Sequence, residues 1–99
     1  MSSSYQVINP ANESIVTSIE LASVEAVDSA IEKADKAFRS WRLIPPGERA
    51  RLLRAFAQEV TNHRHELAAL EVTNSGHTIS NALWEADNVA NVLNYYSAA

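Results

Sequence analysis

Short β-prone runs near the start of the chain give way to apolar residues at helical spacing, and this change of period predicts a hairpin followed by helices. The two runs, Tyr5–Ile8 and Ser14–Ile19, flank an Asn-Pro pair at Asn9 and Pro10 that favours a turn. We therefore predict a two-stranded β-hairpin over residues 5–19. A two-stranded hairpin is marginally stable alone, so it must lie against another part of the protein.

From residue 24 onward, apolar residues recur three and four positions apart, which indicates amphipathic helices. The predicted helices span about 24–40, 46–62, 63–74 and 80–99. The apolar stripe of the last one is broad and consists of Leu83, Ala86, Val89, Ala90, Val92, Leu93 and Tyr96. Ser23 suits the N-cap of the first helix, and Pro46 suits the first position of the second, where a missing N–H costs nothing. The third segment is either a bend in the second helix or a short separate helix, and Gly76 is its natural stop.

The predicted fold class is therefore mainly α with an N-terminal β-hairpin. The chain has 99 residues, enough for one small domain or for a piece of a larger one. No capping residue closes the last apolar stripe before Ala99, so the pattern suggests a truncated chain. The four amphipathic segments and the hairpin are typical of one face of a larger structure, and we expect low stability for the chain alone.

The amino-acid composition excludes several classes of protein and several kinds of site. The net charge of -4 argues against a nucleic-acid-binding module, and the five arginines between positions 39 and 54 are read as a solvated face. The absence of cysteine removes disulfides, thiolate metal sites and a cysteine nucleophile. No apolar run approaches membrane length and no signal peptide is evident, so we expect a cytoplasmic protein with no membrane partner.

Few residues suggest chemistry of their own. His63 and His65 lie two positions apart on a predicted helix and so point to nearly opposite sides, which argues against joint metal binding. The only glycines are Gly47 and Gly76, so no phosphate-binding glycine loop exists. Asp87 differs, because it falls within an apolar stripe. It is either exposed or requires a partner, which could be a cation, an arginine or a helix N-terminus.

Six blocks of sequence, in register over essentially the whole chain, resemble the N-terminal part of the aldehyde dehydrogenase superfamily. The blocks are Val7-Ile8-Asn9-Pro10-Ala11-Asn12, Ala34-Asp35-Lys36-Ala37-Phe38 with Trp41, Pro46-Gly47-Glu48-Arg49-Ala50-Arg51-Leu52-Leu53, Glu66-Leu67-Ala68-Ala69-Leu70-Glu71, Ser75-Gly76 and Tyr95-Tyr96. One departure is Gly76-His77-Thr78, where the family usually has Gly-Lys-Pro. A second is the short leader before Tyr5. Both leave the subfamily and the substrate open.

The resemblance implies that residues 1–99 open the α/β Rossmann-like, NAD(P)-binding domain of an aldehyde dehydrogenase. In that family a cysteine thiolate attacks the aldehyde, a hydride passes to the nicotinamide, and a glutamate-activated water releases the carboxylic acid. The catalytic and cofactor-binding residues lie beyond the length covered here, so none is assigned to this chain. The implied partners are the remainder of the dehydrogenase chain, NAD or NADP, an aldehyde substrate and further copies in a homo-oligomer.

The resemblance also implies one site within these residues. Many family members hold a monovalent cation, Na⁺ or K⁺, between backbone carbonyls after the first strand and an acidic side chain on the last of these helices. The matching positions are Val7, Ile8 and Asp87.

A second hypothesis from another class stays open. Four amphipathic stripes could also belong to a free-standing helical module that pairs with itself or with another protein.

Overall fold

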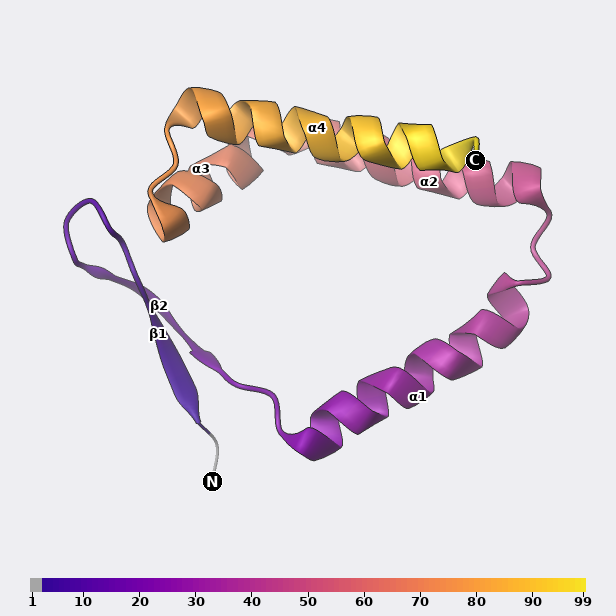
Figure 1. The fold of residues 1–99 in the computed structure, drawn as a ribbon, viewed down its shortest axis with the longest axis horizontal. Coiled ribbons are helices and arrows are strands. Elements are labelled where there is room, and N and C mark those ends of the chain that lie inside the picture. The colour runs from indigo at the N-terminus through magenta and orange to yellow at the C-terminus, as the bar shows by residue number, and fades with distance from the viewer. Residues whose placement is uncertain (1–2) are drawn as a thin grey trace.

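The computed structural model describes residues 3–99, which form a β-hairpin followed by four helices (Figure 1). The strands are β1 (Ser4–Ile8) and β2 (Ile15–Glu20), and the helices are α1 (Val24–Trp41), α2 (Pro46–Asn62), α3 (Arg64–Ser75) and α4 (Ile79–Ser97). The predicted fold class is confirmed, and the observed element ends lie within two residues of the predicted ones.

The hairpin closes through the turn that the Asn-Pro pair predicts. β1 and β2 pair antiparallel, with Tyr5 opposite Ile19, and the register shifts between Val7 and Ile8. Asn9 organises the turn, because its side-chain oxygen accepts a hydrogen bond from the backbone N–H of Ala11 at 2.9 Å. The asparagine therefore supplies the local bond that competes with a straight strand.

Capping residues set the helix ends. Ser23 accepts a hydrogen bond from the backbone N–H of Ala26 at 3.1 Å, which confirms it as the N-cap of α1. α2 ends at Asn62, His63 follows as its C-cap with a backbone that is not helical, and α3 begins at Arg64. The segment after 62 is therefore a separate helix rather than a bend. Gly76 ends α3 in the left-handed conformation, with φ of 78°, as the sequence predicts.

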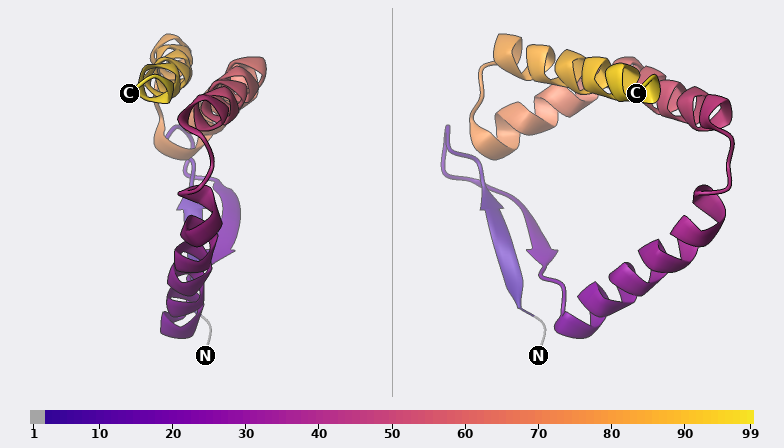
Figure 2. Two further views of the ribbon diagram at one scale, coloured as in Figure 1. Left: turned by 90° about the vertical axis from the view of Figure 1, so that its right-hand side faces the viewer. Right: turned by 45° about the vertical axis from the view of Figure 1, so that its right-hand side comes forward.

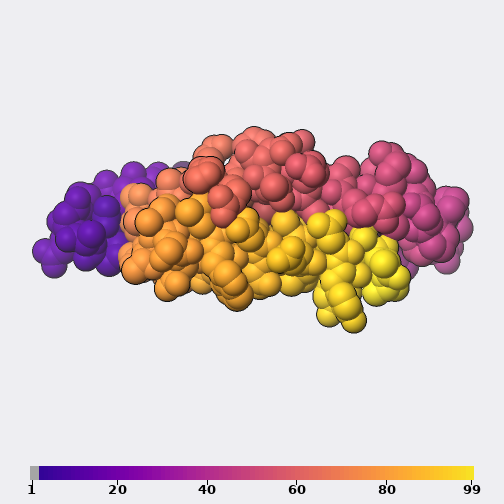
Figure 3. Space-filling model, turned by 90° about the horizontal axis from the view of Figure 1, so that it is seen from above, coloured from indigo at the N-terminus to yellow at the C-terminus, as the bar shows by residue number. Residues whose placement is uncertain are grey.

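The core lies where α4 packs against α2 and α3 (Figure 3). Alanines dominate it: the buried side chains are Ala57, Ala68, Ala82, Ala86, Ala90 and Ser97. Ala82, Ala86 and Ala90 are spaced four apart and so share one face of α4, where their small side chains let the helices approach closely. The larger residues of the predicted α4 stripe, such as Val89 and Tyr96, are exposed instead.

The hairpin and α1 diverge from this helical layer, and the whole chain is thin and open (Figures 1 and 2). It measures 49 × 40 × 17 Å, with a radius of gyration of 17.4 Å. A compact domain of this length has a radius of gyration of about 13 Å. The accessible surface is 7724 Å², against about 5,600 Å² for a compact monomer of this mass.

Large apolar side chains are part of this open surface, above all on α1. α1 buries none of its residues, and its apolar stripe is exposed. The exposed members of that stripe are Val24, Val27, Ile31, Phe38 and Trp41. A stripe of this kind forms only one half of a packed interface, so the described residues lack the surface that would cover it.

Within residues 3–99, none of the helices combines the length and the apolar character needed to cross a bilayer.

Candidate functional site

Asp87, the candidate singled out by the sequence, is bound by an arginine. Nε and Nη2 of Arg64 donate to Oδ1 and Oδ2 of Asp87, both at 2.7 Å. Two parallel bonds of this length are the geometry of a charge-assisted bidentate pair. The pair ties the first residue of α3 to the middle of α4, and the side chains of Arg64 and Asp87 are 30% and 45% exposed. Of the partners that the sequence left open, the structure has the arginine.

The pairing shifts the pKa values of both groups. The hydrogen bonds from Arg64 hold the pKa of Asp87 below its usual range, and the same bonds raise the pKa of the Arg64 guanidinium. Asp87 is therefore ionised at neutral pH and already has a cationic partner.

The other two predicted cation ligands, Val7 and Ile8, lie at the end of β1. Within residues 3–99 no hydrogen bond or ion pair joins Asp87 to this strand, and both carboxylate oxygens of Asp87 accept bonds from Arg64. The cation site at Val7, Ile8 and Asp87 thus stays a prediction.

His63 and His65 have different neighbours: Nδ1 of His63 is 2.8 Å from the backbone oxygen of Glu59, and Nε2 of His65 is 3.5 Å from Nη1 of Arg64. His63 lies at the break between α2 and α3. Its bond to Glu59 raises the pKa of the imidazole, because it favours the protonated form. His63 therefore contributes to a helix end, and Oε2 of Glu59 lies 3.7 Å from its Nδ1.

A cluster that sequence reasoning missed joins the end of α3 to the first half of α4. Nδ1 of His77 lies 3.1 Å from Oε2 of Glu85 and 3.8 Å from Oε1 of Glu71. The three residues are six and eight positions apart, so no helical repeat connects them. The turn at Gly76 brings them together, and the sequence signal for that turn was the glycine itself.

Arg64 was missed for the same reason. It lies 23 positions before Asp87, and only the crossing of α3 over α4 makes the pair. Nothing in the local pattern around Arg64 distinguishes it from the other arginines of the chain.

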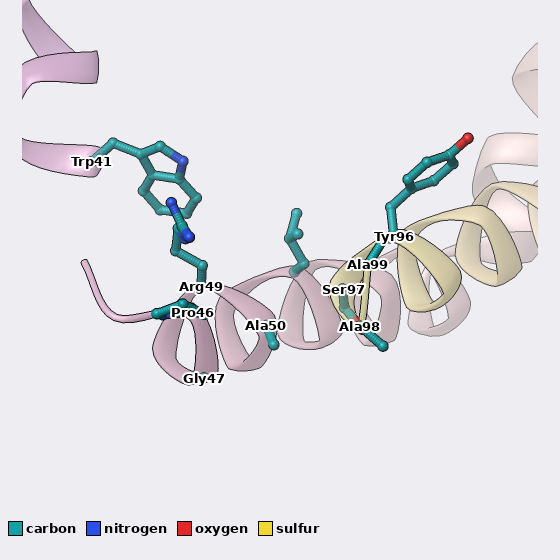
Figure 4. A pocket seen from close by; sticks show the side chains of 10 residues that line it. Trp41, Pro46, Gly47, Arg49, Ala50, Tyr96, Ser97, Ala98 and Ala99 are labelled. Carbon is teal, nitrogen blue, oxygen red and sulfur yellow. The ribbon is translucent and has the colours of Figure 1, made fainter. Parts of the chain in front are cut away.

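A shallow groove of about 450 Å³ lies between the end of α1, the start of α2 and the last residues of α4 (Figure 4). Trp41 and Arg49 stand at one end of the groove and Tyr96 at the other. Ala98 and Ala99 form part of its rim. The polar side chains in its lining are those of Arg49, Tyr96 and Ser97, and none of them is paired there with a histidine or carboxylate side chain that could act as its base.

Comparison with known proteins gives these observations their context. The sequence matches the model of the aldehyde dehydrogenase family over residues 1–99. It is 38% identical, over 96 residues, to the peroxisomal aminoaldehyde dehydrogenase 2 of Malus domestica, covering 92% of this chain and 19% of that protein. It is 37% identical, over 90 residues, to the 3,6-anhydro-alpha-L-galactose dehydrogenase of a Vibrio species, covering 91% of this chain and 19% of that protein.

Solved structures agree. The fold superposes on an NAD-dependent benzaldehyde dehydrogenase from Corynebacterium glutamicum with a TM-score of 0.93 and 29% identity, over 97% of this chain and 21% of that one. Betaine aldehyde dehydrogenase from Staphylococcus aureus, in complex with NAD⁺, gives a TM-score of 0.90 and 28% identity, over 97% of this chain and 20% of that one. The chain thus spans about a fifth of the length of these relatives. It has no cysteine and so lacks the nucleophile on which their chemistry is expected to depend. This chain belongs to the aldehyde dehydrogenase family and corresponds to a segment of its full-length members.

Proposed function

We propose that residues 1–99 are the N-terminal part of the NAD(P)-binding domain of an aldehyde dehydrogenase, and that the complete protein oxidises an aldehyde to a carboxylic acid with NAD⁺ or NADP⁺. The 99-residue chain alone is inactive in this proposal. Its role is structural: the hairpin and helices cover the cofactor-binding sheet formed by the remainder of the chain. A cytoplasmic location and a homo-oligomeric state belong to the same proposal.

The observation that carries the proposal is the open architecture combined with the match to about a fifth of each relative. A chain that keeps an apolar stripe on α1 in water, at a cost of roughly 25 cal/mol for each Å² left uncovered, is expected to be covered by further protein. About four-fifths of the length of each relative lies outside the matched segment, and in this proposal the corresponding part of the complete protein supplies that cover.

The proposed reaction needs groups that the remainder of the chain must supply. A thiolate nucleophile, donors for the oxyanion, a general base and the cofactor-binding residues are all required. The cofactor, when bound, accepts the hydride. Residues 1–99 contribute none of these groups in this proposal and act by holding the domain together.

The first test is the intact mass of the native protein in its source cells, detected with an antibody raised against this chain. A mass several times 10.9 kDa, with aldehyde-dependent formation of NADH or NADPH by the purified protein, is the expected result. A mass near 10.9 kDa would overturn the proposal. NADH formation by the 99-residue chain itself would contradict its expected inactivity.

The second candidate is a free-standing interaction module, and the same exposed stripes favour it. In that case the stripes of several copies, or of another protein, would cover one another. Size-exclusion chromatography with light scattering separates the two functions. A discrete oligomer that melts cooperatively supports the module, whereas aggregation or molten behaviour of the chain alone supports the dehydrogenase segment.

The monovalent-cation site is also part of the proposal for the complete protein. Backbone carbonyls of Val7 and Ile8 with one carboxylate are the hard oxygen donors that such ions prefer. Arg64 donates one hydrogen bond to each oxygen of Asp87 here, so the ion would use a remaining lone pair of the carboxylate. Melting the complete protein and its Asp87→Ala variant in Na⁺, K⁺ and large-cation buffers tests this. The wild type should show an ion-dependent melting temperature that the variant loses, and equal behaviour of the two proteins would contradict the site.

A further inference from the structure

The cluster of Glu71, His77 and Glu85 has the composition and geometry of a metal site. Its three ligand atoms, one imidazole nitrogen and two carboxylate oxygens, all lie within 4.8 Å of one another. Ligands at zinc bond lengths of about 2.0–2.2 Å are about 3.3–3.6 Å apart around a tetrahedral ion. The observed separations from Nδ1 of His77, 3.1 and 3.8 Å, bracket that spacing.

The charges of the cluster also suit a cation. Within residues 3–99 neither Glu71 nor Glu85 forms an ion pair with a lysine or arginine, and His77 is the basic group beside both. Neutral imidazole leaves two carboxylates facing each other with no compensating charge. A divalent ion would balance both of them.

The surroundings hold the ligands in place. Oγ of Ser75 lies 2.8 Å from Oε1 of Glu71 and so supports that carboxylate from outside the cluster. Glu71 and Glu85 also border an apolar groove lined by residues of α2, α3 and α4, including Phe56 and Leu67. Apolar walls on one side lower the local dielectric and strengthen the attraction for an ion.

We propose that Glu71, His77 and Glu85 bind one divalent transition-metal ion, with Zn²⁺ as the probe, through Oε1, Nδ1 and Oε2, and that water completes the coordination. The ion ties the end of α3 to the first half of α4 across the Gly76 turn. Mixed imidazole and carboxylate ligands favour zinc and similar ions over calcium or magnesium. This site is independent of the proposed dehydrogenase function, because none of its residues is assigned to cofactor or substrate.

The test is equilibrium dialysis of the untagged protein, at its full natural length, against Zn²⁺, with bound metal measured by mass spectrometry. The expected result is one Zn²⁺ ion bound per chain. His77→Ala and Glu85→Gln should each weaken binding at least about 10-fold, because even loss of a hydrogen-bond partner of a ligand has that effect. No stoichiometric binding at millimolar Zn²⁺ would overturn the site.

Two variants separate metal binding from other roles of the cluster. His63→Ala removes a histidine that lies outside the cluster, with Oε2 of Glu59 at 3.7 Å from its Nδ1, and should leave binding unchanged. His77→Lys keeps a positive charge between the carboxylates but cannot act as the imidazole ligand. It should preserve the far-UV circular dichroism and lose zinc binding. Wild-type affinity in His77→Lys would mean that His77 serves only as a charged bridge, and the metal site would be wrong.

Discussion

The layer formed by α2, α3 and α4 and the arm formed by the hairpin and α1 are built from equally clear local signals, yet only the layer is packed. Every buried side chain in residues 3–99 belongs to the layer. α1 is amphipathic, capped by Ser23 and negatively charged in its first turn, and it buries nothing. Local signals therefore suffice to make a helix, whereas burial depends on a partner surface, which α4 provides for α2 and which nothing in the described chain provides for α1.

The largest expected effect on the free energy of unfolding concerns the apolar stripe of α1, which we propose is covered in the complete protein. In the 99-residue chain Ile31 is 62% exposed, so Ile31→Ala should change the free energy of unfolding by less than about 0.5 kcal/mol. In the complete protein, where we propose that the stripe is covered, the same change should cost about 2–5 kcal/mol. Urea unfolding of both lengths measures the difference. Equal effects at the two lengths would mean that α1 stays unpartnered.

For the layer, in contrast, we expect a substitution to have the same effect in the 99-residue chain and in the complete protein. Ala57, on α2, is 1% exposed, and Ala57→Leu forces extra atoms into the packed face. The expected cost is about 1–3 kcal/mol in either length of protein. Exposed Ala55, two residues earlier on the same helix, gives a matched control, and Ala55→Leu should be nearly neutral. A neutral Ala57→Leu would contradict the packing of this layer.

A substitution at Gly76 tests the close approach between the hairpin turn and the end of α3. Its φ of 78° is strained for any side chain, and an added Cβ would lie 2.8 Å from Cγ of Pro10 in the hairpin turn. Gly76→Ala should therefore cost about 1–2 kcal/mol from the backbone alone, with a further loss from the clash. Gly47→Ala is the control, because its Cβ would meet nothing within 4 Å. Thermal unfolding that ranks the two variants in the reverse order would contradict the observed turn.

Removal of the helix N-caps compares the arm and the layer through smaller changes in stability. Ser23→Ala and Thr78→Ala each remove an N-cap, of α1 and α4 respectively, at a cost near 1 kcal/mol. In the 99-residue chain, Ser23→Ala should lower helix content without moving the unfolding midpoint of the layer, whereas Thr78→Ala should move it. Circular dichroism with urea measures both, and a shared shift would mean that α1 and the layer unfold as one unit.

The same contrast explains what the sequence could predict. Pro46, Ser23 and Gly76 act within one helical turn of themselves, so the helix ends could be located from the sequence. The buried face of α4 was only partly predicted: Ala86 and Ala90 were included, but the larger Val89 and Tyr96 are exposed. Periodicity ranks residues by hydrophobicity, whereas close helix packing selects small side chains. Arg64 and the Glu71, His77 and Glu85 cluster depend on helix crossings and a turn, which periodicity does not specify.

The smallest effect is the pH dependence of the Arg64–Asp87 pair, which links two helices of the layer. Because the pKa of Asp87 is lower in the folded protein than in the unfolded chain, its contribution to stability is complete above the unfolded pKa of about 3.9. It is lost as the pH falls through the folded pKa. The unfolding midpoints of the wild type and Asp87→Asn should therefore differ at pH 6 and converge below about pH 4. Arg64→Gln should remove the same difference, and the double variant should lose no more than either single one. A difference that did not shrink at all as the pH was lowered below about 4 would mean that Asp87 stabilises the layer through its shape and not through its charge.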